Sequence, residues 1–196
     1  MKKLMVTLAA VAMGVAANAA QVTWGSGTVY LPVLNSSSAY QKAAGSGTFT
    51  GKDGGTYSKV ANMLVWEITA TDWADYNTGK KDIWADYQAG TLKAADAYTG
   101  KTGTTGAINV KGQNYGETDQ GYALVLMTYA SNGSDVDYYI AKAAETEVAV
   151  GTGKTIGNLA GVTSTDVSAW QSVPEPTSGL LLLLGVAGLA LRRRRA

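Results

Sequence analysis

Residues 121–143, GYALVLMTYASNGSDVDYYIAKA, decide the fold class of this chain. Two β-prone runs, 121–130 and 136–143, flank the polar segment Ser-Asn-Gly-Ser-Asp, and Asn-Gly between such runs is a strong hairpin signal. Alternate side chains of a strand point to opposite faces, and a strand that is apolar on both faces is covered on both. The first run is therefore predicted to be a central strand. Its two faces carry Tyr122, Leu124 and Leu126 on one side and Val125, Met127 and Tyr129 on the other.

Further β-prone runs lie on both sides of this hairpin, with Gly, Asn, Asp and Ser between them. Short strands separated by turn residues are typical of sandwiches and barrels. We therefore predict a mainly β fold, a small antiparallel β-sandwich-like domain. The predicted strands outside the hairpin are residues 22–34, 47–50, 58–71, 107–111 and 146–150.

One segment, about residues 72–97, departs from the strand pattern. It contains Trp-Ala-Asp-Tyr twice, starting at Trp73 and at Trp84. The i,i+3 spacing of Trp and Tyr places both rings of each copy on one face of a helix. Asp72 and Asp82 precede the two Trp residues and are the expected N-caps. We predict a short helical insertion: two helices broken at residues 77–79, the second ending towards Gly90, and a short third piece near residues 92–97.

The composition excludes several classes of chemistry. The chain has 196 residues, no His, no Cys and a net charge of +1. Without His and Cys, there is no Ser-His-Asp triad, no Cys-His pair, no haem ligation by these residues and no ordinary zinc site. Residues 20–172 carry ten Lys, fourteen acidic residues and no Arg, a net charge of −4. This acidic body argues against nucleic-acid binding, which depends on neutralising phosphates. We expect no cofactor and no metal centre.

The N-terminus has the layout of a secretory signal peptide. Met1-Lys2-Lys3 is followed by the uncharged apolar run 4–15. Ala17 and Ala19 are small residues at the −3 and −1 positions, which predicts cleavage before Ala20. We therefore expect residues 1–19 to form a signal helix and the Sec export machinery to be a partner. The alternative is a buried N-terminal helix.

The C-terminus combines a proline break, an apolar run and a basic cluster. Pro174-Glu175-Pro176 precedes the thirteen residues 179–191, which have no polar side chain. The prolines interrupt regular structure, and the run beyond them is predicted to be a hydrophobic helix. Its length of about 20 Å is short for a hydrocarbon core of about 30 Å, which suits a temporary anchor in the inner membrane. Arginines after a span belong on the cytoplasmic side of the membrane. The cluster comprises Arg192, Arg193, Arg194 and Arg195.

These C-terminal residues resemble the PEP-CTERM sorting signal. Pro174-Glu175-Pro176, the apolar helix and the arginine cluster occur in the order of that signal, over about 23 of the 196 residues. The resemblance implies recognition and cleavage near the Pro-Glu-Pro motif by exosortase, a membrane-embedded processing enzyme of Gram-negative bacteria. It also implies delivery to the cell surface or outside, in bacteria that make exopolysaccharide. A plain single-pass tail anchor is the alternative. The predicted organisation is a signal peptide (1–19), a β-rich extracellular domain (20–172) and a sorting signal (173–196).

The acidic residues of the helical insertion lie close to tryptophans. Carboxylates beside aromatic rings are what a glycosidase needs, with one acid, one nucleophile or base, and rings that stack on a sugar. The alternative, which we favour, is that the acids cap helices and face solvent while the Trp residues fill the core. The acids are Glu67, Asp72, Asp75, Asp82 and Asp86, and the rings are Trp66, Trp73 and Trp84.

Two other polar patterns receive no site assignment. Asp135 and Asp137 beside Asn132 supply oxygen atoms that suit calcium, but their spacing lacks the distal Glu of an EF-hand loop and fits an ordinary turn. Residues 151–155, Gly-Thr-Gly-Lys-Thr, look like the end of a phosphate-binding loop. Val148 stands where that motif requires its first glycine, so we reject a nucleotide site.

The functional expectation is an exported, exosortase-processed bacterial surface or extracellular-matrix protein. We expect a structural or interaction role, an association with exopolysaccharide, and no catalysis. One alternative is a non-catalytic carbohydrate-binding module in which Trp66, Trp73 and Trp84 contact glycan. The other is a small carboxylate-based glycan hydrolase.

Overall fold

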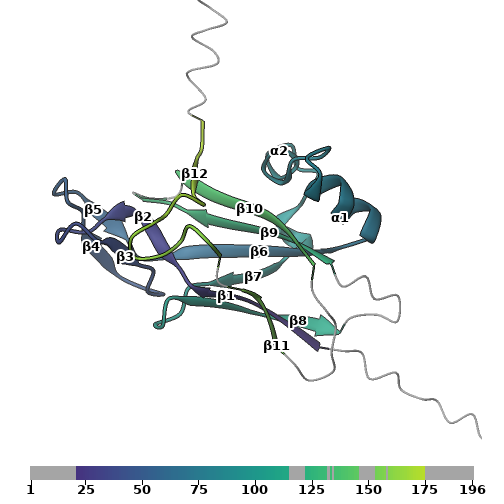
Figure 1. The fold of residues 1–196 in the computed structure, drawn as a ribbon, viewed down its shortest axis with the longest axis horizontal. Coiled ribbons are helices and arrows are strands. Elements are labelled where there is room, and N and C mark those ends of the chain that lie inside the picture. Colours follow the sequence, from purple (N-terminus) through teal and green to yellow (C-terminus); the bar gives the residue numbers. More distant parts are fainter. Residues whose placement is uncertain are drawn as a thin grey trace, which may run out of the picture.

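The computed structural model describes residues 21–114, 122–131, 133, 135–145, 153–157 and 159–174. Its largest element is an antiparallel five-stranded sheet in the order β12-β10-β9-β6-β7 (Figure 1). The hydrophobic hairpin lies at the centre of this sheet, where β9 pairs with β6 on one side and β10 on the other. The strands are β6 (Ala61–Ile68), β7 (Tyr98–Lys101), β9 (Tyr122–Tyr129), β10 (Tyr138–Glu145) and β12 (Gln171–Ser172).

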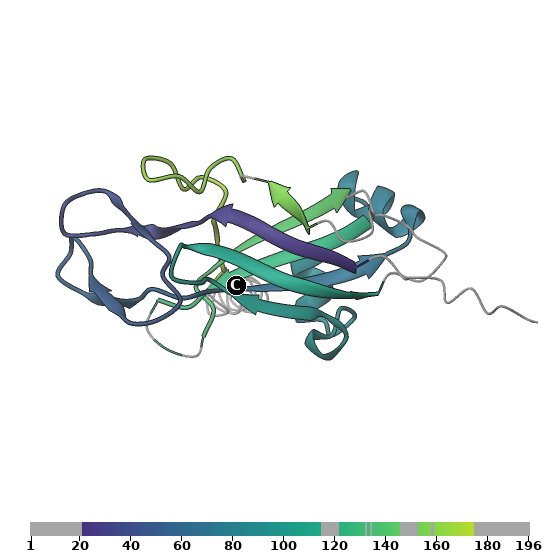
Figure 2. The same cartoon turned by 90° about the horizontal axis from the view of Figure 1, so that it is seen from below.

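A second sheet of three strands lies against one face of the first (Figure 2). Its order is β11-β1-β8, with β8 antiparallel and β11 parallel to β1. The parallel pair departs from the all-antiparallel expectation. The parallel strand, β11, has the sequence Gly-Lys-Thr-Ile-Gly. Its first three residues belong to the segment 151–155 that looks like the end of a phosphate-binding loop. The strands are β1 (Gln21–Thr28), β8 (Ala107–Asn114) and β11 (Gly153–Gly157).

Two small hairpins extend the sandwich at one end, on the left in Figure 1. One joins β2 (Tyr30–Leu34) to β3 (Tyr40–Lys42), and the other joins β4 (Thr48–Thr50) to β5 (Thr56–Ser58). The predicted single strand 22–34 is thus two strands, which separate at the buried Val29. The hairpins touch through an isolated bridge between Asn35 and Gly51.

The main core lies between the two sheets, and strand β9 supplies much of it. Every residue of β9 after Tyr122 is buried, which confirms that this is a central strand covered on both faces. Burying a Val, Leu or Met side chain contributes about 1.5–3 kcal/mol, so this strand is a large part of the stability of the fold. Its side chains in the main core are those of Ala123, Val125, Met127 and Tyr129.

A second apolar cluster covers the opposite face of the five-stranded sheet. Leu124 and Leu126 of β9 belong to it, so alternate residues of one strand serve two cores. Helices α1 (Ala70–Asn77) and α2 (Ile83–Gln88), with the 3-10 helix η1 (Ala94–Asp96), connect β6 to β7 and cover this face (Figure 1). The helical insertion and the break between its two helices are therefore confirmed.

The caps of the two helices differ in part from the expectation. Asp82 caps α2, because its side chain accepts a hydrogen bond of 2.7 Å from the N–H of Ala85. Asp72 does not cap α1. Thr69 does, accepting a 3.1 Å bond from the N–H of Asp72 and donating a 2.9 Å bond to the Asp72 carboxylate. Asp72 is thus the third residue of the helix, a first-turn position that favours an acid because of the helix dipole.

The structure confirms the hairpin and the β-sandwich-like class. Tyr129 pairs with Tyr138, so the connecting loop is longer than the predicted segment 131–135. The predicted signal helix, the C-terminal hydrophobic helix and the strand 146–150 lie outside the described residues. Within the described ranges, no helix is long and apolar enough to cross a bilayer.

Candidate functional site

Two of the three tryptophans proposed to contact glycan are core residues. Trp66 and Trp84 are only 4% and 8% exposed. The indole N–H of Trp66 donates a 2.9 Å hydrogen bond to the carbonyl of Lys93, which holds the end of the insertion against β6. The ring of Tyr87 packs near both, with its centroid 6.1 Å from that of Trp66 and 5.9 Å from that of Trp84. Neither indole presents an open face to a sugar, so this burial argues against the predicted glycan contact of these two residues.

Trp73 lies apart from that pair on helix α1. It is half-buried, and its ring packs on Tyr122 with centroids 5.0 Å apart. Its indole N–H is buried and has no hydrogen-bond partner among the described residues. The three tryptophans therefore do not form one binding platform.

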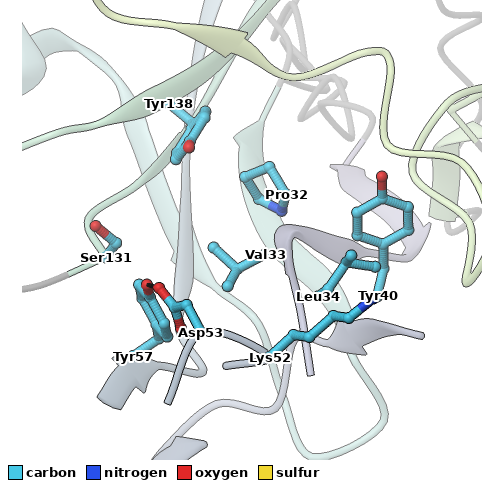
Figure 3. Close-up of a pocket in the computed structure, with 9 residues that line it drawn as sticks. All are labelled: Pro32, Val33, Leu34, Tyr40, Lys52, Asp53, Tyr57, Ser131 and Tyr138. Atoms are coloured by element: carbon cyan, nitrogen blue, oxygen red, sulfur yellow. Dashed lines mark hydrogen bonds between the residues drawn. The ribbon is translucent and has the colours of Figure 1, made fainter. Parts of the chain in front are cut away.

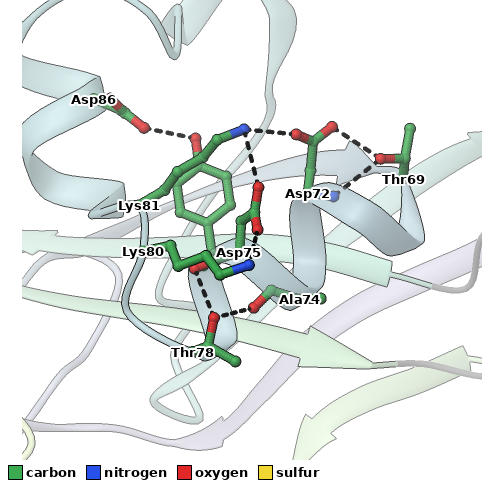
Figure 4. Close-up of polar contacts among 9 residues, drawn as sticks. Thr69, Asp72, Ala74, Asp75, Thr78, Lys80, Lys81 and Asp86 are labelled. Carbon is green, nitrogen blue, oxygen red and sulfur yellow. Dashed lines mark hydrogen bonds and ion pairs between the residues drawn. The ribbon is translucent and has the colours of Figure 1, made fainter.

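The acids of the insertion are held by a polar network that ties its two helices together (Figure 4). The ammonium of Lys81 lies 2.8 Å from one Asp72 oxygen and 3.9 Å from one Asp75 oxygen. Lys80 pairs with Asp75 at 3.2 Å. The hydroxyl of Tyr76 donates a 2.8 Å hydrogen bond to Asp86, which lies on the next helix.

The contacts of this network stabilise the charged forms of Asp72 and Lys81. The hydrogen bond from Lys81, followed by that from Thr69, lowers the pKa of Asp72. The same bond to Asp72 raises the pKa of Lys81. Burial, and then the hydrogen bond to Asp86, raises the pKa of Tyr76. Lys81 lies between Asp72 and Asp75, and Asp82 caps α2, so these described acids belong to a network that supports the two helices.

Asp137, one of the two acids considered for calcium, closes the β9–β10 hairpin. Its carboxylate accepts hydrogen bonds from the backbone N–H and the hydroxyl of Ser131. Its own N–H donates a 3.0 Å bond to the carbonyl of Tyr129. Asn132 lies outside the described residues, and Asp135 is exposed. In the part of the chain that the structure describes, no three acidic side chains gather around a point that a metal ion could occupy.

A groove at the end of the sandwich is a candidate site that the sequence did not reveal (Figure 3). Its volume is about 380 Å³, and three tyrosines line it, so we call it the tyrosine groove. Tyr57, Asp53 and Ser131 lie on one side, Tyr40 and Lys52 on the other. Its residues come from the β2–β3, β4–β5 and β9–β10 hairpins, and no local spacing links them. The lining comprises Pro32, Val33, Leu34, Tyr40, Lys52, Asp53, Tyr57, Ser131 and Tyr138.

A tyrosine–carboxylate pair is built into the turn of the β4–β5 hairpin. The hydroxyl of Tyr57 donates to one oxygen of Asp53, and the N–H of Gly55 donates to the other at 2.9 Å. These two bonds, the Tyr57 bond first, lower the pKa of Asp53, and the bond to Asp53 raises the pKa of Tyr57.

Glycine at position 51 makes room for that pair. A Cβ atom on Gly51 would lie 2.6 Å from a carboxylate oxygen of Asp53 and would also overlap the Tyr57 ring. A side chain at this position therefore conflicts with both members of the pair, which would have to shift to accommodate it.

The folded body continues to the first residues of the C-terminal signal. Strand β12 pairs with β10 through Ser172 opposite Tyr138 and Gln171 opposite Tyr139. The N–H of Val173 then donates a 2.8 Å hydrogen bond to the carbonyl of Asp137. Pro174 is exposed and is the last residue described. Glu175, Pro176 and the arginine cluster lie outside the described residues, as do Ala17, Ala19 and Ala20.

The PEP-CTERM protein-sorting motif matches residues 172–195. The match confirms the resemblance seen in the sequence, and it includes Pro174-Glu175-Pro176 and the four arginines. The motif implies an exported protein that exosortase recognises through a membrane-anchored C-terminal signal. No curated protein and no solved structure matched the chain.

Proposed function

We propose that this protein is an exosortase-processed surface or extracellular-matrix protein whose β-sandwich has a non-catalytic structural or binding role in exopolysaccharide. The observation that carries the proposal is the PEP-CTERM motif at residues 172–195, which begins in the last strand of the folded body. Strand β12 and the Val173 hydrogen bond attach the start of the motif to the sheet edge, so cleavage near Pro174 leaves the sandwich intact.

The positions of the acids support a non-catalytic role. Hydrolysis of a glycosidic bond uses two carboxyl groups that face each other across the bond. Asp72 and Asp75 share Lys81, Asp82 caps a helix, and Asp86 accepts from Tyr76. These contacts engage the acids of the insertion away from the tyrosine groove, so a glycan hydrolase at the insertion is the least supported alternative.

A carbohydrate-binding module is the second candidate, and the tyrosine groove favours it. Aromatic rings beside a few polar groups are typical of small-ligand sites. In this module the contacts come from Tyr40, Tyr57 and Tyr138 in place of the tryptophans that the sequence suggested. A carbohydrate-binding module would be exported in the same way as a structural protein, but it would have a defined glycan site.

Retention of the protein on the exopolysaccharide of its producer tests the proposal. The surface form of the wild type is incubated with the purified polymer and sedimented. A full-length variant with Pro174→Ala, Glu175→Gln and Pro176→Ala is followed in parallel through cell fractions. We expect the wild type to leave the membrane fraction and to sediment with the polymer, and the variant to stay in the membrane fraction. Wild-type protein that does not sediment with the polymer contradicts the proposed role.

A further inference from the structure

We propose that the tyrosine groove is a binding site for an uncharged stretch of polysaccharide. This inference rests on the proposed function and adds the site and the chemical class of the ligand. The groove residues lie at the hairpin end of the sandwich, and none of the acids or tryptophans of the helical insertion lines it.

Two of the three rings of the groove, those of Tyr57 and Tyr138, are held in position before any ligand binds. Tyr57 packs on Phe49 with centroids 5.6 Å apart, and Tyr138 packs on Tyr129 with centroids 6.2 Å apart. Phe49 and Tyr129 are buried in the main core. Tyr57 is also fixed through its hydroxyl by Asp53. Because these rings lose little freedom on binding, the groove is preorganised for a flat, partly apolar ligand such as a pyranose ring.

The polar groups of the groove suit the hydroxyls of a sugar. Asp53 uses one bond on each oxygen inside its hairpin. A carboxylate has about four lone-pair sites, so it can still accept from sugar hydroxyls. Lys52, on the other side, is exposed and donates. The volume of about 380 Å³ lies at the small end of the usual 300–1,000 Å³ for ligand pockets, which suits a short stretch of polymer passing through.

The charges of the groove and of the body favour an uncharged polymer. Among the described residues of the lining, Lys52 and Asp53 are the charged side chains, and their charges cancel. Residues 20–172 carry a net charge of −4, so a polyanion meets a repulsive field as it approaches. An uncharged glycan meets no such field, and its binding depends little on salt.

The test uses the processed surface form and the exopolysaccharide of the producer. The polymer is partly depolymerised and separated by anion exchange into a neutral and an anionic fraction, which are immobilised as the probes. The groove variants are Tyr40→Ala, Tyr40→Phe and Asp53→Asn. The matched control is Tyr87→Ala, which removes a half-buried tyrosine from the opposite face of the main sheet. Thermal unfolding shows that each variant is folded at the temperature of the binding assay.

We expect the wild type to bind the neutral fraction, with less than about a twofold change in Kd between low and high salt. Tyr40→Ala raises Kd about fivefold or more, because loss of a stacking ring costs about 1 kcal/mol. Tyr40→Phe keeps the ring and stays within about twofold of the wild type. Asp53→Asn weakens binding, and Tyr87→Ala leaves it unchanged.

Three results overturn the inference while the proposed function stands. They are an unchanged Kd in folded Tyr40→Ala and Asp53→Asn, binding to the anionic fraction alone, and an equal loss of binding in Tyr87→Ala. A wild type that binds neither fraction and does not sediment with the intact polymer overturns the inference and the proposed function together.

Discussion

The indole of Trp84 lies flat on the phenol ring of Tyr139, with centroids 4.2 Å apart and ring planes 8° apart. Trp84 is the second residue of helix α2, and Tyr139 lies on β10, so this stack joins the helical insertion to the main sheet. The same Tyr139 donates a 2.9 Å hydrogen bond to Gln171 of β12, the strand that precedes the sorting signal. One tyrosine therefore connects the insertion, the sheet and the edge strand.

Replacing Trp84 by alanine is expected to destabilise the protein strongly. Its side chain is 8% exposed and fills the second apolar cluster. Truncation of such a residue costs about 3–5 kcal/mol, because it loses buried surface and leaves a cavity. Urea unfolding of Trp84→Ala and the wild type measures this loss. A change under about 1 kcal/mol contradicts the packing described.

Trp66→Phe and Trp73→Phe test whether the hydrogen bond of each indole N–H contributes to stability. The N–H of Trp66 donates to Lys93, whereas the buried N–H of Trp73 has no partner in the described part of the chain. A hydrogen bond contributes about 0.5–1.5 kcal/mol net, and an unpaired buried donor is unfavourable. We expect Trp66→Phe to cost more stability than Trp73→Phe in the same urea assay. The reverse order contradicts the assignment.

Acid is expected to weaken the α1–α2 network at a pH set by Asp72. Its pKa is lowered from 3.8 by Lys81 and then Thr69. Its contribution is therefore present above the unfolded-state pKa and is lost as the pH falls through the lower folded-state pKa. Lys81→Ala removes part of this contribution, so the difference from the wild type is larger at pH 7 than at pH 3. Added salt reduces this stability difference between Lys81→Ala and the wild type, since the Lys81–Asp72 ion pair is partly exposed. A difference that grows on acidification contradicts this prediction.

Alkaline pH is expected to destabilise the fold because the buried Tyr129 resists deprotonation in the folded state. Burial, followed by the charge of Asp137, raises the pKa of Tyr129 above its ordinary 10.0. Above pH 10 the unfolded chain loses a proton that the folded chain keeps, so stability is full below that pH and falls above it. Tyr129→Phe is less stable than the wild type at neutral pH, since the hydrogen bond to the Ser58 carbonyl is lost. Between pH 10 and 11, however, its unfolding free energy falls less steeply with pH than that of the wild type. Unfolding free energies at several pH values compare the slopes, and an unchanged slope refutes the assignment.

Replacing Gly51 by alanine is expected to disturb the tyrosine groove. The new Cβ atom conflicts with Asp53 and the Tyr57 ring, and overpacking of this kind typically costs about 1–3 kcal/mol. Gly54→Ala is the matched control in the same turn. Gly54 has a φ of +83°, which strains alanine, but a Cβ atom there meets nothing within 4 Å. Both variants lose stability, and only Gly51→Ala loses affinity for the neutral fraction. Equal affinities in the two variants contradict the role assigned to Gly51.

The features predicted from sequence are those with a local cause. Strand β9 is apolar on both faces and is followed by Asn-Gly, so the central hairpin is evident in one short stretch. The i,i+3 Trp–Tyr pairs likewise indicate the helices. The α1 cap was misassigned because Thr69 and Asp72 are both good capping residues and only the geometry separates their roles.

The features missed depend on contacts between distant segments. Strand β11 is Gly-rich and becomes a strand by pairing with β1, more than a hundred residues earlier in the chain. The residues of the tyrosine groove come from three hairpins, so no local sequence spacing predicts the groove. The burial of Trp66 and Trp84 depends on how the insertion folds back over β9, which the helical pattern alone leaves open.

Intact-mass determination of the surface form tests the central claim most directly, because it locates both ends of the mature chain in one measurement. We predict a chain that begins at Ala20, ends close to Pro174-Glu175-Pro176 and lacks the four arginines. A surface form that still ends at Ala196 contradicts it.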